Sequence, residues 1–166
     1  MRSANPNGRA SEGGGMALLT QEHRSAIGRE LPPVTAEVTR REIRKYAAAT
    51  GQRLQKFIEG DEAPPMFLFG LFTPILPRER LGHDGLPPDS GLVPELPLKR
   101  VMAGGSEQSW FRGIHAGDVL VSQHTLLDLF EKEGTRGPLI FVVVENRVET
   151  EAGEPVMTER STWIAR

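Results

Sequence analysis

The apolar residues of the chain concentrate in one short segment that has no polar face. From Met66 to Phe72 the only residue without a large apolar side chain is Gly70, and Pro64 and Pro65 stand just before the run. Proline is tolerated in the first turn of a helix, where backbone N–H groups lack partners. The pattern therefore predicts a helix over residues 63–72. Because a helix that is apolar all round is usually buried all round, we expect the rest of the chain to surround it.

The second half of the chain has the short apolar runs and the turn residues that are typical of strands. They predict a four-strand antiparallel meander, over residues 101–112, 119–130, 138–149 and 155–165. Residues 34–38 add a further strand. Because a strongly twisted sheet can curl around one helix, we predict an α+β hot-dog fold. It is an antiparallel sheet of at least five strands wrapped around one central apolar helix.

Two capping patterns predict helices in the first half of the chain. Thr20 precedes a short helix that Gly28 ends, and Thr39 with Glu42 forms a capping box before a longer helix that ends at Gly51. In a capping box the threonine side chain accepts from the N–H three residues on, and the glutamate reaches back.

The apolar run over residues 139–144 does not alternate between apolar and polar side chains. A strand that is apolar on both faces is covered on both faces. We expect the central helix on one face and a second subunit on the other, so the sequence predicts an oligomer.

Composition narrows the classes of protein and of partner. Residues 1–15 are rich in glycine and small polar residues, which predicts a disordered tail rather than a signal peptide, with Met16 as an alternative start. Residues 16–166 then form a single hot-dog domain. With 20 basic and 22 acidic residues and no basic stripe, we expect no nucleic acid partner. The apolar run is too short to cross a membrane, and the absence of cysteine excludes thiolate nucleophiles and suits the cytoplasm.

Three strings carry a family resemblance over residues 20–166. They are Leu-Gly-His-Asp-Gly-Leu-Pro at 81–87, Leu-Pro-Leu-Lys-Arg-Val-Met-Ala-Gly-Gly at 96–105 and Glu-Lys-Glu-Gly-Thr-Arg-Gly-Pro-Leu-Ile-Phe-Val at 131–142. The second and third together are fairly specific, although either alone is weak. With these strings the chain resembles the N-terminal, non-catalytic half of MaoC-type hydratases. It is similar to mesaconyl-CoA and itaconyl-CoA hydratases and to the mitochondrial-type 3-hydroxyacyl-thioester dehydratase.

The resemblance implies reversible addition of water to an enoyl thioester of CoA or acyl carrier protein, with no further cofactor. In active members an aspartate and a histidine lie in a Gly-Asp-x-Asn-Pro-x-His string, because dehydration needs a base and an acid within hydrogen-bond reach. Here the string reads Gly51-Gln52-Arg53-Leu54-Gln55-Lys56-Phe57. Gln52 replaces the aspartate, and Phe57 or Lys56 replaces the histidine, so this degenerate motif cannot carry a proton. The chain thus resembles the substrate-binding partner of a two-part dehydratase, whose catalytic pair lies on another hot-dog unit.

We expect substrate binding beside the predicted helix and along the strand over residues 101–112. Arg100 suits a CoA phosphate or an acidic acyl group. Gly104 and Gly105 mark either a bulge or a close approach of an acyl chain. Trp110 and Phe111 point to opposite faces, one to the central helix and one outward. The predicted substrate-binding residues are Pro64, Pro65, Met66, Arg100, Gly104, Gly105 and Trp110.

Four histidines are the remaining candidates for proton transfer. We expect His23 to be exposed on its helix and His124 to be a hydrogen-bonded strand residue. His83 and His115, both in predicted turns, are the weak alternatives for catalysis, with Asp61 or Glu62 as acidic partner. No metal-ligand spacing joins the histidines, so we predict no metal site.

Three functions therefore compete at this stage. The first is a hydro-lyase subunit in acyl-thioester or fatty acid metabolism, which binds substrate and forms a dimer with a catalytic MaoC-type partner. The second is a self-sufficient, homo-oligomeric hydratase. The third is a non-enzymic acyl-CoA-binding protein. A thioesterase also stays open, because fold does not fix chemistry.

Overall fold

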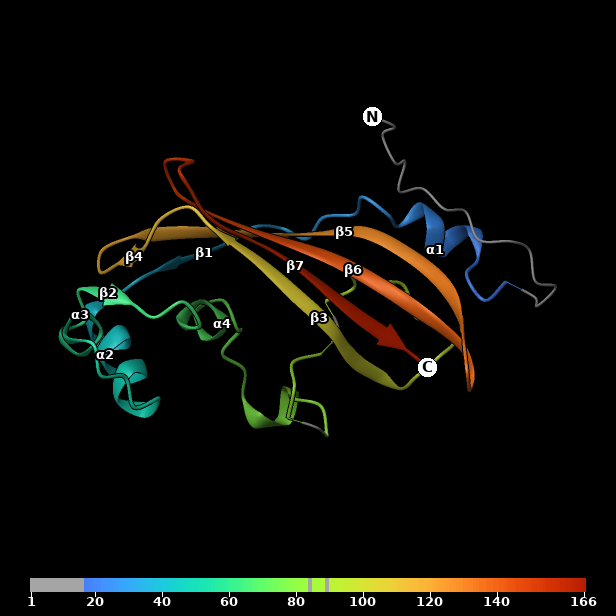
Figure 1. Cartoon of the computed structure of the whole chain (residues 1–166), viewed down its shortest axis with the longest axis horizontal. Helices are drawn as coiled ribbons and strands as arrows, with labels where there is room; N and C mark the ends of the chain where they lie inside the picture. The colour runs from blue at the N-terminus through green and yellow to red at the C-terminus, as the bar shows by residue number, and fades with distance from the viewer. Residues whose placement is uncertain (1–16, 84, 89) are drawn as a thin grey trace, which may run out of the picture.

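The structure is a computed structural model that describes residues 17–83, 85–88 and 90–166. Five strands form one antiparallel sheet in the order β1-β5-β6-β7-β3. Their bounds are β1 Val34–Glu37, β3 Val101–Trp110, β5 Val119–Gly134, β6 Gly137–Thr150 and β7 Pro155–Ala165. The sheet is strongly curved, and helices lie below one end of its concave face (Figure 1). This arrangement confirms the predicted α+β hot-dog fold.

The strand order differs from the predicted four-strand meander. Only β5, β6 and β7 follow one another as hairpins, whereas β3 pairs with β7 at the far edge of the sheet. Two contacts explain the difference. Between β3 and β5 the chain leaves the large sheet, because β4 (Ile114–His115) pairs with β2 (Glu62–Ala63). In addition, β1 occupies the side of β5 on which β3 would have to pair in a meander.

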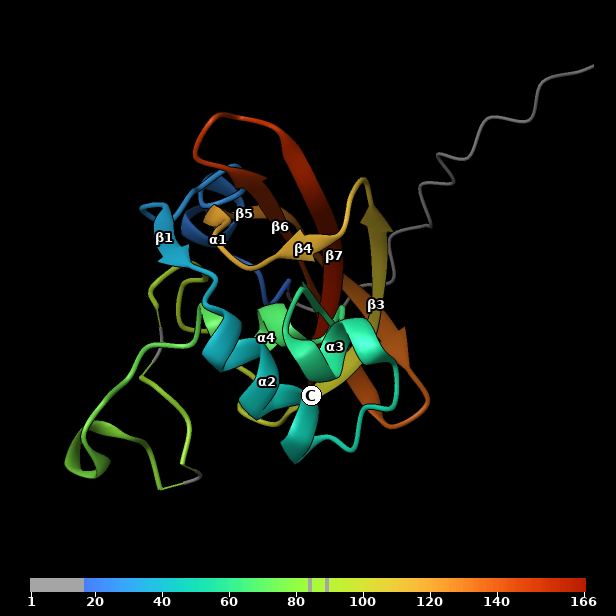
Figure 2. The ribbon, with the colours of Figure 1, turned by 90° about the vertical axis from the view of Figure 1, so that its left-hand side faces the viewer.

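Both predicted capping residues begin helices. Thr20 caps α1 (Gln21–Ser25), and Thr39 caps α2 (Arg40–Ala49) by accepting from the Glu42 N–H at 3.2 Å. The structure adds α3 (Gln55–Glu59) and a 3-10 turn, η1 (Arg78–Arg80). Figure 2 shows α2 and α3 in front of the curved sheet, with α1 at its other end.

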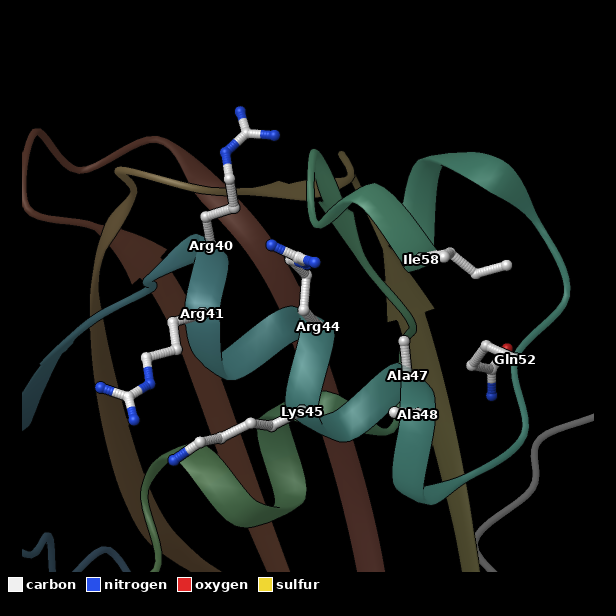
Figure 3. A pocket seen from close by; sticks show the side chains of 8 residues that line it. All are labelled: Arg40, Arg41, Arg44, Lys45, Ala47, Ala48, Gln52 and Ile58. Atoms are coloured by element: carbon white, nitrogen blue, oxygen red, sulfur yellow. The ribbon is translucent and has the colours of Figure 1, made fainter.

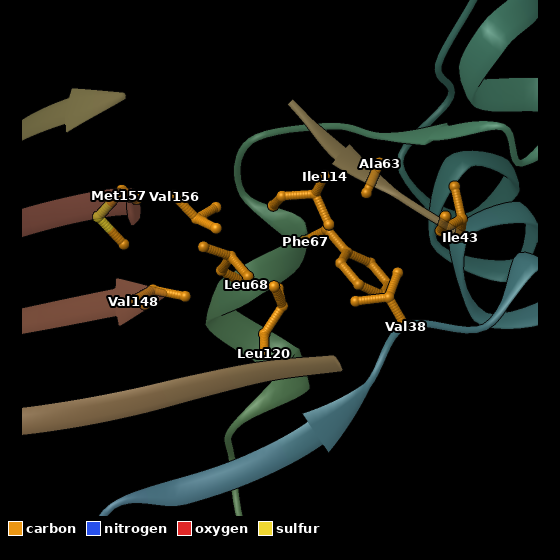
Figure 4. Close-up of a cluster of buried hydrophobic side chains, with 10 residues drawn as sticks. All are labelled: Val38, Ile43, Ala63, Phe67, Leu68, Ile114, Leu120, Val148, Val156 and Met157. Atoms are coloured by element: carbon orange, nitrogen blue, oxygen red, sulfur yellow. The ribbon is translucent and has the colours of Figure 1, made fainter. Parts of the chain in front are cut away.

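The apolar helix is shorter and more exposed than the sequence predicts. It is α4 (Phe67–Leu71), with Phe67 and Leu68 buried against the sheet. In contrast, Phe69 is 81% exposed and Met66 is 55% exposed. The expectation of burial all round is therefore wrong for this single chain, because the sheet covers only one side of α4. Figure 4 shows Phe67 and Leu68 directed at the buried apolar side chains of the neighbouring elements.

Two apolar clusters lie on the concave face. The first apolar cluster joins α4 and α2 to one end of the sheet, and its buried members are Val38, Ile43, Ala63, Phe67, Leu68, Ile114, Leu120, Val148, Val156 and Met157. The second apolar cluster joins the other end of the sheet to α1 and to the segment after η1, and includes Leu19, Ala26, Leu92, Leu126, Leu129 and Ile140. Residues 92–98, which precede β3, therefore pack against the sheet of their own chain.

His23 is buried, although the sequence predicts an exposed residue. Its Nδ1 accepts from the Thr20 N–H at 3.0 Å, and its Nε2 lies 3.0 Å from the Glu95 carbonyl oxygen. Because a carbonyl oxygen only accepts hydrogen bonds, the proton lies on Nε2. The ring takes the part of the glutamate in a capping box and joins α1 to the segment before β3.

The predicted tail over residues 1–15 lies outside the described residues. Within the described part of the chain, no helix is long and apolar enough to cross a membrane.

Candidate functional site

The degenerate motif lies where α2 ends and α3 begins. Gly51 adopts a positive φ of 65°, which turns the chain, and the Gln52 N–H donates to the Ala47 carbonyl at 2.9 Å. The Gln52 side chain is half-buried and donates from Nε2 to the Thr50 hydroxyl at 3.2 Å. Phe57 is only 8% exposed and packs into the protein. Neither side chain can carry a proton.

A groove of about 790 Å³ lies over α2 and α3 beside Gln52. We call it the basic groove, because four of its eight lining residues are cationic. Its lining is Arg40, Arg41, Arg44, Lys45, Ala47, Ala48, Gln52 and Ile58. Figure 3 shows the cations along α2, with Arg44 at the centre and with Gln52 and Ile58 on the side of α3.

A second groove, of about 420 Å³, lies between α3 and the end of β3. We call it the aromatic groove, and it brings together Phe57 with two predicted substrate-binding residues, Pro65 and Trp110. Lys56, Glu62, Ala63, Phe111, Arg112, Gly113 and Ile114 complete its lining. Trp110 packs against the first apolar cluster while Phe111 is 58% exposed, so the predicted split of the two aromatic residues is confirmed.

Arg112 is the most strongly held cation of the aromatic groove. Its Nη2 donates to Asp118 Oδ1 at 3.1 Å, and its Nε lies 3.8 Å from a Glu154 carboxylate oxygen. Its Nη1 is buried and has no hydrogen-bond partner among the described residues. Asp118 also accepts from the His115 N–H at 2.7 Å, which closes the turn between β4 and β5.

A third groove, of about 320 Å³, separates α2 from α4. We call it the apolar groove, since Tyr46, Ala49, Phe67, Gly70 and Leu71 form most of its lining. Lys45 lines both this groove and the basic groove, so the two meet at that side chain.

The other predicted substrate-binding residues do not join these grooves. Arg100 pairs through its backbone with Arg166 before the start of β3, whereas Trp110 ends that strand. Ten residues of extended chain separate the two by about 30 Å. Gly104 and Gly105 form a bulge against β7, and a Cβ on Gly104 would lie 3.0 Å from the Ile164 side chain. The bulge interpretation of the glycines is thereby confirmed. Pro64 is buried and Met66 is exposed, and neither lines a groove described above.

The two weak catalytic alternatives have different surroundings. His115 is exposed on β4 and stands opposite Glu62 of β2, so the structure brings together one predicted acid–base combination. Glu62, however, is paired with Lys56 Nζ at 2.7 Å. His83 is exposed in a turn closed by backbone bonds of Gly82, and its neighbour Asp84 lies outside the described residues.

His124 belongs to a polar band that sequence reasoning missed. His124, Asn146 and Glu159 are register partners on β5, β6 and β7. Ser122 donates to Asn146 Oδ1 at 2.7 Å, and Ser106 and Gln108 donate to Glu159. The band separates the two apolar clusters. The expected hydrogen bond of the His124 ring is not found among the described residues. Burial lowers the pKa of His124, while the charge of Glu159 acts in the opposite direction.

The basic groove was missed as well, although its signal is visible in the sequence. Arg40, Arg41, Arg44 and Lys45 recur at positions that share one side of a helix. No group of three or more histidine, aspartate or glutamate side chains within the described ranges is placed to hold a metal ion.

Comparison with known proteins supports the family resemblance. The family described as "FAS1-like, dehydratase domain region" matches residues 25–159. A UPF0336 protein of Saccharopolyspora erythraea is 34% identical over 148 residues, covering 86% of this chain and 90% of the relative. Mesaconyl-C(4)-CoA hydratase of Chloroflexus aurantiacus is 30% identical over 81 residues, covering 49% of this chain and 29% of that protein.

Solved structures show the same fold at low sequence identity. The ChsH1-ChsH2 complex of Mycobacterium tuberculosis contains a chain with a TM-score of 0.63 and 18% identity, with 87% of this chain and 86% of that chain covered. The HadBC (3R-hydroxyacyl-ACP dehydratase) complex of the same organism gives 0.53 and 17%, covering 84% and 97%. A MaoC-like dehydratase of Rhodospirillum rubrum gives 0.54 and 17%, covering 84% and 91%.

Proposed function

Because this chain belongs to the FAS1-like dehydratase-region family, within the MaoC-type hydratases and dehydratases, we propose that it is a substrate-binding hydro-lyase subunit. Its substrate is an acyl thioester of CoA or acyl carrier protein, and its partner is a catalytic MaoC-type hot-dog chain. The reaction is the reversible hydration of an enoyl thioester. We place the pair in fatty acid or related acyl-thioester metabolism in the cytoplasm.

The observation that carries the proposal is the chemistry of residues 52 and 57. Dehydration removes a proton next to the thioester carbonyl and protonates a leaving hydroxyl, so it needs a base and an acid. Gln52 is an amide held by Thr50, and Phe57 is a buried hydrocarbon. A chain that keeps the fold without these two groups is suited to binding and needs the acid and base of another chain.

Two unpartnered surfaces support an assembly with a second hot-dog chain. β3 is an edge strand whose first nine residues are exposed, and such an edge offers a row of free backbone donors and acceptors to another strand. On α4, Met66 and Phe69 present apolar surface to solvent. Among similar folds, the names of the ChsH1-ChsH2 and HadBC structures describe complexes of two components.

The grooves offer a place for the thioester. The apolar groove contains Gly70 and Ala49, whose small side chains leave room for an alkyl arm beside Phe67. The aromatic groove adds the side chain of Trp110 as further apolar surface.

Reconstitution tests the proposal. The full chain is purified alone and after co-production with a MaoC-type chain that carries Gly-Asp-x-Asn-Pro-x-His, and hydration of crotonyl-CoA is followed by loss of its enoyl absorbance. We expect turnover by the pair at least about 100-fold above either chain alone, since general acid–base groups contribute about 10²–10⁴-fold. Equal specific activity of this chain without the partner would refute the borrowed-site proposal. Binding of crotonyl-CoA by the pair without turnover would favour the non-enzymic alternative.

One observation favours a second candidate, a self-sufficient hydratase that uses His115. His115 and Glu62 face each other across β2 and β4 at the edge of the aromatic groove. If a homo-oligomer of this chain hydrates crotonyl-CoA, His115→Ala and Glu62→Gln should each lower kcat at least about 100-fold. His83→Ala, which changes an exposed histidine in a remote turn, is the matched control and separates the two weak alternatives.

A further inference from the structure

The basic groove holds cations that the fold itself does not use. Arg40 is paired with Asp61 and donates to the Glu59 carbonyl at 3.2 Å. Arg41, Arg44 and Lys45, in contrast, have no hydrogen-bond or ion-pair partner among the described residues. This concentration of positive charge occurs in a chain whose net charge is −2.

Helix stability does not account for these cations. Arg40 and Arg41 occupy the first turn of α2, where the positive end of the helix dipole favours acidic side chains. The only acidic residue of that turn, Glu42, accepts a hydrogen bond from the Thr39 hydroxyl at 2.6 Å. Arg40 and Arg41 are therefore at an unfavourable place for the helix, and Arg41, unlike Arg40, has no acidic partner among the described residues.

The floor of the basic groove is apolar and recessed. Ala47 is buried at the bottom of the recess, the small side chain of Ala48 is exposed, and Ile58 of α3 is 45% exposed beside them. The volume of about 790 Å³ lies within the range of sites for small ligands. A flat planar group would cover the aliphatic surface while guanidinium forks bind phosphates bidentately.

We infer that the basic groove binds the nucleotide end of coenzyme A, its 3′-phosphorylated adenosine diphosphate. Arg41, Arg44 and Lys45 bind the phosphates, and the exposed surface of Ala48 and Ile58 receives the adenine. Lys45 also lines the apolar groove, so the pantetheine arm leaves the basic groove at that side chain toward α4. The inference rests on the proposed function for the identity of the thioester.

The same geometry decides between the two carriers of a thioester. An acidic carrier protein would bind a convex basic surface through its own side chains and would not need a recess with an aliphatic floor. The concave groove favours CoA, and a preference for carrier protein is one of the outcomes of the test.

Gln52 contributes to this site as an uncharged residue. Its neutral amide lines the basic groove, whereas an aspartate at this place would put a negative charge among the cations and compete with a phosphate.

Calorimetric titration of the full chain with CoA tests the inference. The variant R41Q/R44Q/K45Q should bind CoA about 30-fold more weakly, since a lost charge-assisted hydrogen bond changes affinity about tenfold or more. The matched control R24Q/R78Q/R80Q removes the same charge from exposed residues of α1 and η1. It should bind CoA as the unmodified chain does. For the unmodified chain, 3′-dephospho-CoA should bind about tenfold more weakly than CoA.

A second variant keeps every cation and guards against a folding defect. Gln52→Asp should weaken CoA binding about fivefold, with an unchanged melting temperature, by adding an opposing charge. Equal affinity of the basic-groove variant and its control would overturn the inference. So would a loss of binding to acyl carrier protein without a loss for CoA.

The outcome is separable from that of the proposed function. If the reconstituted pair hydrates crotonyl-CoA and the basic-groove variant leaves both its KM and the CoA affinity unchanged, the groove inference fails and the subunit proposal stands. If CoA binds through these cations and no partner yields turnover, the subunit proposal fails and the groove inference stands.

Discussion

At the scale of single residues, burial and charge decide what each histidine can do. His23 is buried in a capping network, His124 is half-buried in the polar band, and His83 and His115 are exposed. Proton transfer needs a titratable group next to the reacting atoms. Of these four histidines only His115 is the register partner of a carboxylate, that of Glu62. It also lies beside Gly113, which lines the aromatic groove. That is why it carries the second candidate function.

The pKa of His124 predicts a pH dependence of stability. Burial holds the pKa of His124 below its ordinary value of 6.5, and the charge of Glu159 only partly offsets this. The unfolded chain therefore binds the proton more tightly than the folded chain. The contribution of His124 to stability is complete above pH 6.5 and is lost as the pH falls through 6.5 toward the folded-state pKa.

Urea unfolding at pH 7.5, 6.5 and 5.5 measures this effect. The variant His124→Gln should lose less stability over that range than the unmodified chain does. His83→Gln, at an exposed position, is the control and should keep the original slope. An unchanged slope in His124→Gln would contradict the assignment.

Residue-level prediction from the sequence succeeded where the signal is local. Thr20 and Thr39 cap their helices as predicted. It failed for His23, whose burial depends on Glu95, a residue far along the chain. Prediction from the sequence also missed Arg41 and Arg44, because a charged helix face is usually solvated. Only the structure shows that a groove lies beside these residues.

At the scale of elements, α4 has a buried face and an open face. Phe67 and Leu68 belong to the first apolar cluster, whereas Phe69 is 81% exposed. A large apolar side chain gains roughly 1.5–3 kcal/mol when it is fully buried. The open face is therefore the part of the helix that a second chain would stabilise.

A pair of substitutions separates the two faces of α4. Phe69→Asp should leave the thermal unfolding of the monomeric chain nearly unchanged, within about 0.5 kcal/mol, and should weaken assembly about 10–100-fold. Analytical ultracentrifugation with and without the catalytic partner measures assembly. Phe67→Ala should instead destabilise the chain by about 3–5 kcal/mol, because it leaves a cavity in the first apolar cluster.

Ile27→Asp is the control for an exposed apolar residue on another part of the chain, since Ile27 is 40% exposed beyond the end of α1. Assembly that tolerates Phe69→Asp as well as it tolerates this control would argue against α4 as a contact surface.

The positions of the strands were easier to predict than the order in which the strands pair. Alternation and turn residues located β1, β3, β5, β6 and β7 to within a few residues. The pairing of β3 with β7 was not predictable from those patterns, because it depends on β4 leaving to meet β2. The burial of α4 was overestimated for a related reason. Apolar composition does not show how much of a helix is covered by its own chain.

At the scale of the whole molecule, three grooves surround α2 and α3, and no acid–base pair stands at the position of the family's motif. The basic groove and the apolar groove meet at Lys45, and the aromatic groove lies on the other side of α3. No described part of the chain covers the outer edge of β3 or the open face of α4. These features are the basis of the proposed subunit role, in which a second chain supplies the acid and the base.

The central claim is that the acid and the base lie on the partner chain. The most direct test is the turnover number of the reconstituted pair after substitution of the titratable groups of one chain or of the other. Replacing the aspartate or the histidine in the partner's Gly-Asp-x-Asn-Pro-x-His string should lower kcat for crotonyl-CoA hydration by about 10²–10⁴-fold. The combined substitution of His83, His115 and His124 by glutamine in this chain should leave kcat within about threefold, because no proton passes through them. The opposite result, a kcat that survives loss of the partner's pair and collapses with this chain's histidines, would contradict the account.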